Sequence, residues 1–300
     1  MLSLILTILC SASINLGFAL AKEKGQRNLA VTWFNYFMAS AVSAGMLLRS
    51  LPLEGKLSFS ALAGNLRGGL TPDGSLTLAI LFGAAVGGVY IAALLSVQYS
   101  ILRCGPSPAT MFNRLGTCGS VLLSMVIFGE RPSVLCWCGI ALAMTALVIY
   151  NSGTGSFRPQ GILALTFVLG AVSEFSNKLF SAWCLPQYKP LYLLCVFGTA
   201  WALCTLVLWS RRKGEMRGRF TLGEAALGCA VGCVNLGSAF FLIRALDTLP
   251  ATVVFPAMCG GVVALIALLG RVFFREQLGK RGWTAIALTV ISLVLINLYP

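Results

Sequence analysis

The sequence predicts an all-α integral membrane protein of ten transmembrane helices, arranged as two inverted repeats of five helices each. Three observations lead to this prediction. Of the 300 residues, 58% are hydrophobic and only 10% are charged, whereas about a quarter of the residues in soluble domains are charged. The apolar residues form runs of roughly 20 residues, the length that a helix needs to cross a bilayer. Finally, several motifs recur in the same order in both halves of the chain.

Ten apolar runs are long enough to be spans, and a helix is expected for each because it satisfies its own backbone hydrogen bonds inside the bilayer. The expected spans cover residues 3–21, 29–49, 76–100, 106–128, 133–151, 160–183, 189–210, 221–245, 249–273 and 281–299. Prolines open the fourth and ninth spans, where the first turn of a helix tolerates them. Residues 50–74 form the longest polar stretch, in which a short interfacial helix is expected.

The internal repeat rests on four sets of matching residues. They are residues 82–90 with 227–235, Pro108-Ala109-Thr110 with Pro250-Ala251-Thr252, Glu130 and Trp137 with Glu276 and Trp283, and Asn151 with Asn297. The first repeat therefore covers residues 1–152 and the second covers residues 160–300. Because each repeat contains five spans, the second enters the membrane from the opposite side. Such inverted repeats are typical of secondary transporters.

The charge distribution fits a membrane rather than a nucleic acid. The formal net charge is +13, but the Lys and Arg residues lie mostly between apolar runs, where orientation in the membrane and anionic headgroups account for them. Counting those at the span ends, the odd-numbered connections carry 14 Lys and Arg residues and the even-numbered ones carry 6. The more basic side is expected to be cytoplasmic, which would place both termini outside.

The residues that most cofactor and metal sites need are missing. There is no His, and the 11 Cys residues are scattered singly through apolar segments, where they read as small packing residues rather than zinc ligands. No GxxxxGK[ST] motif is present for ATP. We therefore expect no cofactor, no metal and no enzymatic activity, with transport driven by a gradient or by exchange. Protons are a candidate coupling ion.

One motif resembles a known family. The segment from Phe128 to Gly139, with Phe-Gly-Glu-Arg-Pro-Ser followed by Trp-x-Gly, and its second copy from Phe274 to Trp283 resemble the EamA-type members of the drug/metabolite transporter superfamily. The resemblance implies export or exchange of amino acids, sugars, nucleotide sugars or other metabolites. It also implies a central cavity lined by spans one to four and six to nine. It further implies cytoplasmic termini, which is opposite to the charge count.

Charged residues inside the spans are the main candidates for a substrate site, because such residues are costly in a membrane. Arg114 lies in span four, where Asn113 and Arg114 replace the Phe255-Pro256 pair of span nine. Its guanidinium could clamp a carboxylate or phosphate; the alternatives are an ion pair with Glu174 or a side chain that snorkels to the interface.

A second group of candidates lies in span six. Glu174, Asn177 and Lys178 share one helix face because they are three and four residues apart. Glu174 is the one acidic residue expected at mid-membrane, where it could bind a substrate amine or a coupling proton. The alternative is that Glu174 and Lys178 neutralise each other.

Further polar residues could line the same site. Tyr90 and Asn235 occupy equivalent repeat positions, each after a small-xxx-small pattern that lets helices approach closely. Asn15 is a weaker candidate, together with Asn35, Gln98 and Ser238. For these, hydrogen bonding between helices is the alternative role.

The two matching glutamates at the ends of spans four and nine, Glu130 and Glu276, are read as structural. They would pair with Arg131 and Arg275 or cap the helix that follows. A gating role is the alternative.

These observations favour a secondary active transporter, an exporter or exchanger of a small polar metabolite such as an amino acid, which works by alternating access. Transport of phosphorylated or nucleotide-linked sugars or of drugs is the alternative within the class. A passive channel and an intramembrane enzyme are the alternatives outside it. The expected partners are the solute and the lipid bilayer, without nucleic acid, for a monomer or homodimer in a bacterial plasma membrane.

Overall fold

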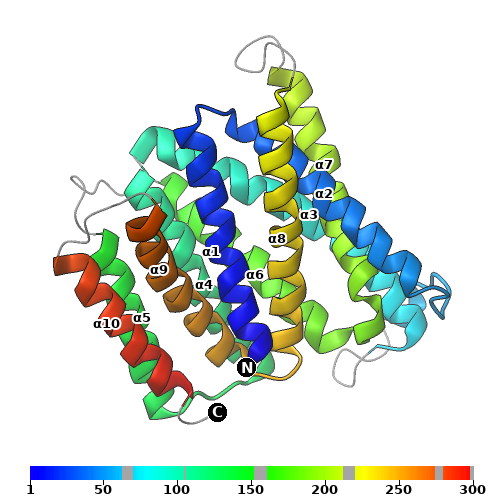
Figure 1. Ribbon diagram of the computed structural model, residues 1–300. Coiled ribbons are helices and arrows are strands. Elements are labelled where there is room, and N and C mark those ends of the chain that lie inside the picture. The colour runs from blue at the N-terminus through cyan, green and yellow to red at the C-terminus, as the bar shows by residue number, and fades with distance from the viewer. Residues whose placement is uncertain (63–69, 105, 152–160, 212–219, 274–279, 298–300) are drawn as a thin grey trace. The chain divides into compact units, whose positions relative to one another are not determined.

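A computed structural model describes residues 1–62, 70–104, 106–151, 161–211, 220–273 and 280–297. In this part of the chain the secondary structure consists of α-helices and two short 3-10 helices, with no strands (Figure 1). In order they are α1 (Leu2–Glu23), α2 (Asn28–Arg49), η1 (Ser60–Leu62), α3 (Pro72–Cys104), α4 (Pro106–Phe128), α5 (Val134–Asn151), α6 (Gly161–Trp183), η2 (Pro186–Tyr188), α7 (Lys189–Arg211), α8 (Leu222–Leu246), α9 (Ala251–Phe273) and α10 (Lys280–Asn297). The predicted all-helical class is confirmed.

Six of the described helices are long and apolar enough to cross a membrane. They are α1, α2, α3, α6, α8 and the continuous stretch from η2 through α7. Shorter apolar stretches lie in α4, α5 and α9. About 20 predominantly apolar residues match the hydrocarbon thickness of a bilayer. Six helices of this kind make the chain a membrane protein. That all ten helices cross the bilayer stays a prediction.

Helix α3 is longer than its apolar core predicts. It covers 33 residues and starts before the predicted span of 76–100. Its first turn is polar but satisfied: the Asp73 carboxylate accepts a hydrogen bond from the Lys56 N–H at 2.6 Å, and the Thr77 hydroxyl donates to the Asp73 carbonyl. A negative side chain in the first turn also suits the helix dipole. The interfacial helix expected within residues 50–74 is a three-residue 3-10 turn, η1, in the described part of that stretch.

The chain packs as two compact units. Unit 1 comprises Met1–Ala12, Ala92–Lys178 and Ala245–Pro300, and unit 2 comprises Ser13–Ile91 and Leu179–Arg244. The boundaries fall inside α1, α3, α6 and α8. Each unit therefore takes helices from both predicted repeats, 1–152 and 160–300, which remain a prediction about the sequence.

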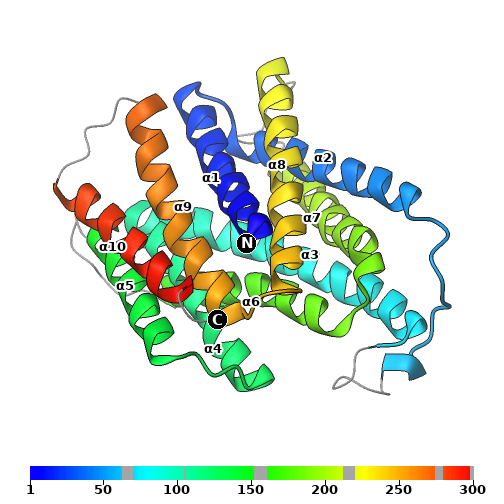
Figure 2. The ribbon, with the colours of Figure 1, turned by 60° about the horizontal axis from the view of Figure 1, so that its bottom comes forward.

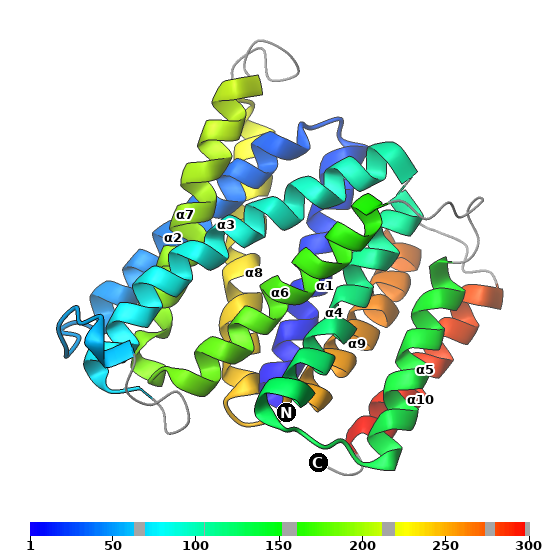
Figure 3. The ribbon, with the colours of Figure 1, turned by 180° about the vertical axis from the view of Figure 1, so that it is seen from behind.

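In unit 1, α5 and α10 lie side by side and α9 packs against both (Figure 2). The Ser292 hydroxyl of α10 donates to the Gly139 carbonyl of α5 at 2.7 Å. In unit 2, α2 packs along α7 (Figure 3). There the Trp33 indole N–H donates to the Thr205 hydroxyl at 2.8 Å.

Two pairs of glycines bring helices of unit 2 into close contact, as the small-xxx-small pattern predicts. Gly83 and Gly87 of α3 lie against α7, and Gly228 and Gly232 of α8 lie against α2. A Cβ atom on Gly83 would lie only 2.9 Å from a side chain of α7, and one on Gly228 only 2.5 Å from a side chain of α2. Apart from the backbone nitrogen of Ala200, the contacted residues have the same spacing in both helices: Tyr192, Cys195, Val196 and Thr199 in α7, and Val31, Phe34, Asn35 and Met38 in α2.

Glycines also bring α4 close to α6 in unit 1. A Cβ atom on Gly116 would lie 2.9 Å from backbone atoms of α6, and one on Gly119 would lie 2.7 Å from the Ala171 Cβ. The Ser120 hydroxyl donates to the Ala171 carbonyl at 2.9 Å across the same interface. Close backbone approach of this kind stabilises helix pairs in membranes.

Candidate functional site

Two opposite charges lie on the facing helices α4 and α6 of unit 1. Arg114 and Glu174 are both half-buried. No ion pair joins them among the described residues, so the structural ion pair considered from the sequence is not formed. The Oε2 atom of Glu174 is buried without a hydrogen-bond partner, and so is the hydroxyl of Thr117 on α4.

Helix α9 packs against the backbone of α4 at Arg114 and against the next residue, Leu115. The buried Cys259 thiol donates to the Arg114 backbone carbonyl at 3.8 Å. Leu115 of α4 packs against Cys259 and Val263. A buried ion pair stabilises a protein only if its geometry is good. Arg114 and Glu174 lie on facing helices without forming such a pair, which is unusual.

Lys178, the second predicted cation, is engaged elsewhere. Its Nζ lies 2.9 Å from Oε1 of Glu130, and the two side chains are only 12% and 13% exposed. The same Nζ lies 5.4 Å from the centre of the Phe128 ring, a favourable position for a cation. The predicted alternative in which Glu174 and Lys178 neutralise each other is therefore wrong.

Glu130 caps a helix that is distant in sequence. Its carboxylate accepts hydrogen bonds from the backbone N–H groups of Ala251 at 3.1 Å and Thr252 at 3.0 Å, the first residues of α9. These are donors that a helix cannot satisfy itself. The sequence predicted a pairing with Arg131 or a cap on the following helix, and both are corrected: the partner is Lys178 and the capped helix is α9.

The shape of the chain before Glu130 explains how it reaches α9. Gly129 has a φ of +67°, in the left-handed region that glycine adopts without strain. Its N–H donates to the Met125 carbonyl at 3.0 Å, which ends α4 in a common glycine-capped form. Burial opposes ionisation of Glu130, but the hydrogen bonds from Lys178, Thr252 and Ala251 outweigh it and lower the pKa of the carboxyl.

The other predicted residues of unit 1 lie along the same two helices. Asn177 is buried, and its amide donates to the Ser173 carbonyl of its own helix at 3.3 Å. Asn113 lies at the α4–α6 contact, where a Cβ on Gly170 would be 3.1 Å from the Asn113 carbonyl oxygen. Unit 1 therefore contains Asn113, Arg114, Glu174, Asn177 and Lys178.

Of the remaining candidates, Gln98 lies on α3 in unit 1, whereas Asn15, Asn35, Tyr90, Asn235 and Ser238 belong to unit 2. The Asn235 amide of α8 donates to the Asn35 side-chain oxygen of α2 at 3.1 Å, so Asn35 has the interhelical role that was its alternative. Tyr90 of α3 stacks edge-on against Phe197 of α7, with ring centres 6.2 Å apart. Asn15 lies on α1, half-buried. Glu276, the repeat partner of Glu130, lies outside the described residues.

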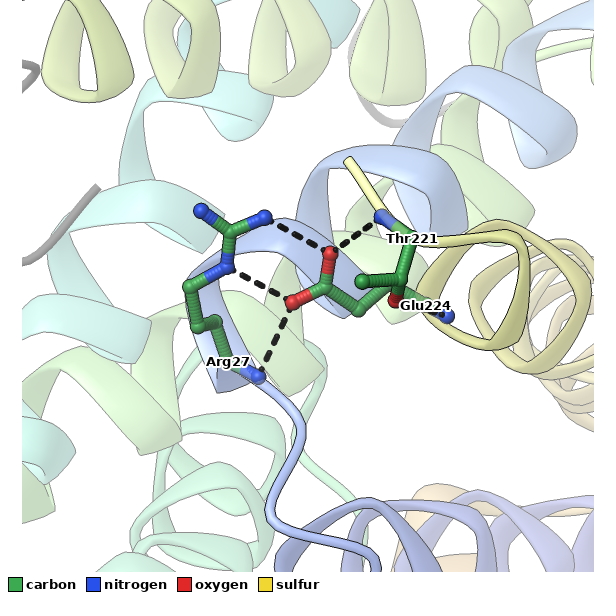
Figure 4. Close-up of polar contacts among 3 residues, drawn as sticks. All are labelled: Arg27, Thr221 and Glu224. Carbon is green, nitrogen blue, oxygen red and sulfur yellow. Dashed lines mark hydrogen bonds and ion pairs between the residues drawn. The ribbon is translucent and has the colours of Figure 1, made fainter. Parts of the chain in front are cut away.

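Unit 2 contains a second ionic cluster, formed by Arg27, Thr221 and Glu224 (Figure 4). The sequence did not predict it. The Arg27 guanidinium donates from Nε to Oε1 of Glu224 at 2.7 Å and from Nη2 to Oε2 at 2.8 Å. Thr221 and Glu224 bond each other's backbone N–H groups, which is a capping box at the start of α8. The Phe220 ring lies 5.8 Å from the guanidinium carbon. The hydrogen bond to Glu224 raises the pKa of Arg27.

One part of this cluster, the cap of α8, has a recognisable sequence pattern. Thr221-x-x-Glu224 directly before an apolar run is the sequence pattern of a capping box. The partner cation, Arg27, has no such signal, because it lies 197 residues away.

Comparison with known proteins supports the fold alone. No protein-family model matches the sequence, and no curated protein matches it. A solved structure described as "Crystal structure of protein" superposes over 99% of this chain and 96% of its own, with a TM-score of 0.71 and 16% sequence identity. At this identity the match shows that the two chains share a fold.

Proposed function

We propose that this protein is a secondary active transporter of a small zwitterionic metabolite, such as an amino acid. The observation that carries the proposal is the pair of opposite charges on α4 and α6 that form no ion pair with each other. Arg114 is roughly 12 Å along α4 from its start, at 1.5 Å per residue, inside an apolar stretch. Ionisable groups at such positions mark function by default, because the membrane makes them costly.

The engagement of Lys178 favours a zwitterion over a phosphorylated sugar. A phosphate would suit two cations, but Lys178 is held by Glu130 at 2.9 Å. Arg114 and Glu174 then remain as one cation and one anion. The Arg114 guanidinium would bind the solute carboxylate with two parallel hydrogen bonds, and Glu174 would bind its amino group.

The matched helix contacts support the proposed architecture of ten spans in two inverted repeats. The glycines of α3 contact α7 at the same spacing at which the glycines of α8 contact α2. Likewise Gly119 of α4 contacts α6, and Gly261, its counterpart in α9, contacts Ile8 of α1. Two inverted repeats can exchange inward-open and outward-open shapes, which is the basis of alternating access. The EamA-like motif and the absence of an ATP motif fit the same proposal, in a bacterial plasma membrane.

Counterflow in proteoliposomes tests the proposal. Vesicles loaded with an unlabelled compound are assayed for uptake of the labelled one, with L-alanine, L-leucine and L-phenylalanine as zwitterions and glucose 6-phosphate as the phosphorylated probe. We expect saturable counterflow of at least one amino acid. Arg114→Ala and Glu174→Gln should each reduce it by about 30-fold, the cost of losing one charged contact in a desolvated site.

Arg103→Ala is the matched control, because Arg103 is an exposed arginine at the end of α3 that stacks on Tyr99. It should retain counterflow. Full activity of a folded Arg114→Ala variant would overturn the site. Counterflow of glucose 6-phosphate alone would overturn the substrate class, and flux that never saturates would indicate a channel.

A further inference from the structure

Two buried polar atoms of α4 and α6 have no hydrogen-bond partner among the described residues. One is Oε2 of Glu174 on α6, and the other is the hydroxyl oxygen of Thr117 on α4. Thr117 is only 1% exposed. A buried polar atom without a hydrogen bond is costly, so each such atom in a native protein requires an explanation, such as a bound group. The proposed function uses Glu174 but gives Thr117 no role.

Thr117 lies on the side of α4 that faces α6. It comes four residues after Asn113 and three residues before Ser120, so the three share one helix face. The Asn113 carbonyl lies against Gly170 of α6, and the Ser120 hydroxyl donates to the Ala171 carbonyl of α6 at 2.9 Å. The face of α4 that carries Thr117 is therefore the face that packs on α6.

Glu174 lies on the opposing side of the same interface. It comes four residues after Gly170 and three after Ala171, two residues of α6 that lie against α4. A side chain in a helix covers the turn that precedes its own Cα atom, so the Glu174 carboxylate extends toward the level of these contacts. The two unsatisfied oxygens of Thr117 and Glu174 therefore share one helix interface without bonding each other.

Arg114 adds a cation to these two acceptors. It comes three residues before Thr117 on the same face of α4, which is roughly 4.5 Å along the helix. An α-amino acid carries its carboxylate and its ammonium group on one carbon atom, so neighbouring partners can hold both. A carboxylate on Arg114 would place the ammonium group between Thr117 and Glu174.

Two unsatisfied acceptors match a group with at least two N–H donors. A carboxylate accepts hydrogen bonds only, and a hydroxyl oxygen has lone pairs that accept them. A primary or secondary ammonium group can satisfy both atoms, whereas a tertiary one has a single N–H and a quaternary one has none. A site with buried acceptors rejects an analogue that lacks the donor, because an acceptor is then left unpaired.

We infer that Thr117 and Glu174 together bind the ammonium group of the solute, and that Thr117 makes the site select amines with two or more N–H donors. The inference rests on the proposed function, because it concerns the same site. It adds a specificity-determining residue to that site and restricts the class of substrate.

Binding to the purified full chain in detergent tests this selectivity. A ligand of the folded state raises the apparent Tm by mass action, so titrations give relative affinities. L-Alanine, L-leucine and L-phenylalanine are each compared with their N-methyl and N,N-dimethyl forms. We expect the parent and N-methyl forms to bind at least about tenfold more tightly than the N,N-dimethyl forms, the effect of one hydrogen bond to a charged group.

Thr117→Val shows whether the selectivity comes from the hydroxyl. It should weaken binding of the parent amino acids about tenfold and leave the N,N-dimethyl forms unchanged, so that the preference is lost. Both proteins meet the bulk of the added methyl groups, so the ratio of affinities isolates the hydrogen bond. The Tm without ligand should not fall, because the Thr117 hydroxyl has no partner to lose.

Ser124→Ala is the matched control. It removes another buried hydroxyl of α4 that has no partner in the described residues, seven residues after Thr117 and roughly 10 Å farther along the helix. The preference for the parent amino acids should remain. Loss of the preference in both variants would mean a general change in α4 and would overturn the role of Thr117.

Failure of this inference differs from failure of the proposed function. If none of the three amino acids raises the Tm or shows counterflow, the proposed function is overturned and this inference falls with it. If they bind and exchange but the N,N-dimethyl forms bind equally well, the proposed function stands and the inference is overturned. A wild-type preference in Thr117→Val, or a lower Tm of that variant without ligand, overturns it as well.

Discussion

Two glutamates use the same chemistry in different parts of the molecule. Glu224 in unit 2 and Glu130 in unit 1 each accept backbone N–H bonds at the start of a helix and each bind a cation. Glu224 caps its own helix from three residues inside it and holds Arg27 with a two-point fork. Glu130 caps α9 from 121 residues away and holds Lys178 at a single point. The cap made by Glu224 is local, although its ion pair with Arg27 joins residues 197 apart in sequence. The cap and the ion pair of Glu130 both depend on tertiary structure.

This difference predicts unequal costs of removal. Glu130 and Lys178 are both largely buried, whereas the Arg27 side chain is 24% exposed. A cation left buried without its partner destabilises the fold strongly, whereas a partly exposed one regains water. The two clusters are therefore best compared by breaking each in turn.

The largest effect is expected from Glu130→Ala. It leaves Lys178 buried without its carboxylate and leaves two N–H groups of α9 without an acceptor, which should cost about 3 kcal/mol of unfolding free energy. Reversible unfolding in mixed detergent, followed by tryptophan fluorescence, measures it. Glu130→Gln combined with Lys178→Met should recover part of the loss. A loss below that of Glu224→Ala, which leaves the partly exposed Arg27 without its partner, would contradict the comparison.

The turn that aims Glu130 is the next target. Gly129→Ala places a side chain at a φ of +67°, which should cost about 1 to 2 kcal/mol. Nothing lies within 4 Å of a Cβ at this position, so the cost would come from backbone conformation alone. Gly129→Asn is the matched control, because asparagine tolerates this conformation better than alanine does. Equal stability of the alanine and glycine proteins would refute the argument.

Thr221→Ala breaks the local half of the other cluster. The hydroxyl of Thr221 accepts the Glu224 N–H at 3.2 Å, and losing such a cap should cost about 1 kcal/mol. Thr221→Ser keeps the hydroxyl and should keep the stability. The same unfolding assay measures both variants, and a loss as large as that of Glu130→Ala would show that this capping box is not merely local.

Acid should weaken the Glu130 cluster by a smaller and graded amount. The pKa of Glu130 is lower in the folded protein than its ordinary value, so its contribution is complete above the unfolded pKa and is lost as pH falls through the folded pKa. The stability difference between the wild type and Glu130→Gln should therefore be constant near neutral pH and shrink below the ordinary glutamate range. A difference that grows in acid would mean that the pKa is raised instead.

In the candidate site, too, the sequence predicts local features but not the contacts between distant residues. The sequence placed Arg114 and Glu174 inside apolar runs, and the grouping of Glu174, Asn177 and Lys178 on one helix face follows from helical spacing alone. The sequence did not predict the partners of these residues. Lys178 turns to Glu130, and Asn235 bonds Asn35 across 200 residues. Such pairings depend on which helices become neighbours, and apolar periodicity does not encode this.

By itself, the sequence determined that this chain is a helical membrane protein and where its helices lie. Runs of apolar residues and their flanking prolines and glycines act over one or two turns, so they can be read along the chain. Only the tertiary structure decided that Glu130 caps α9 and that α3 packs on α7 as α8 packs on α2. The physical reason is that these contacts join residues far apart in sequence. In a membrane, close packing and polar pairing, rather than the hydrophobic effect, select the helices that meet.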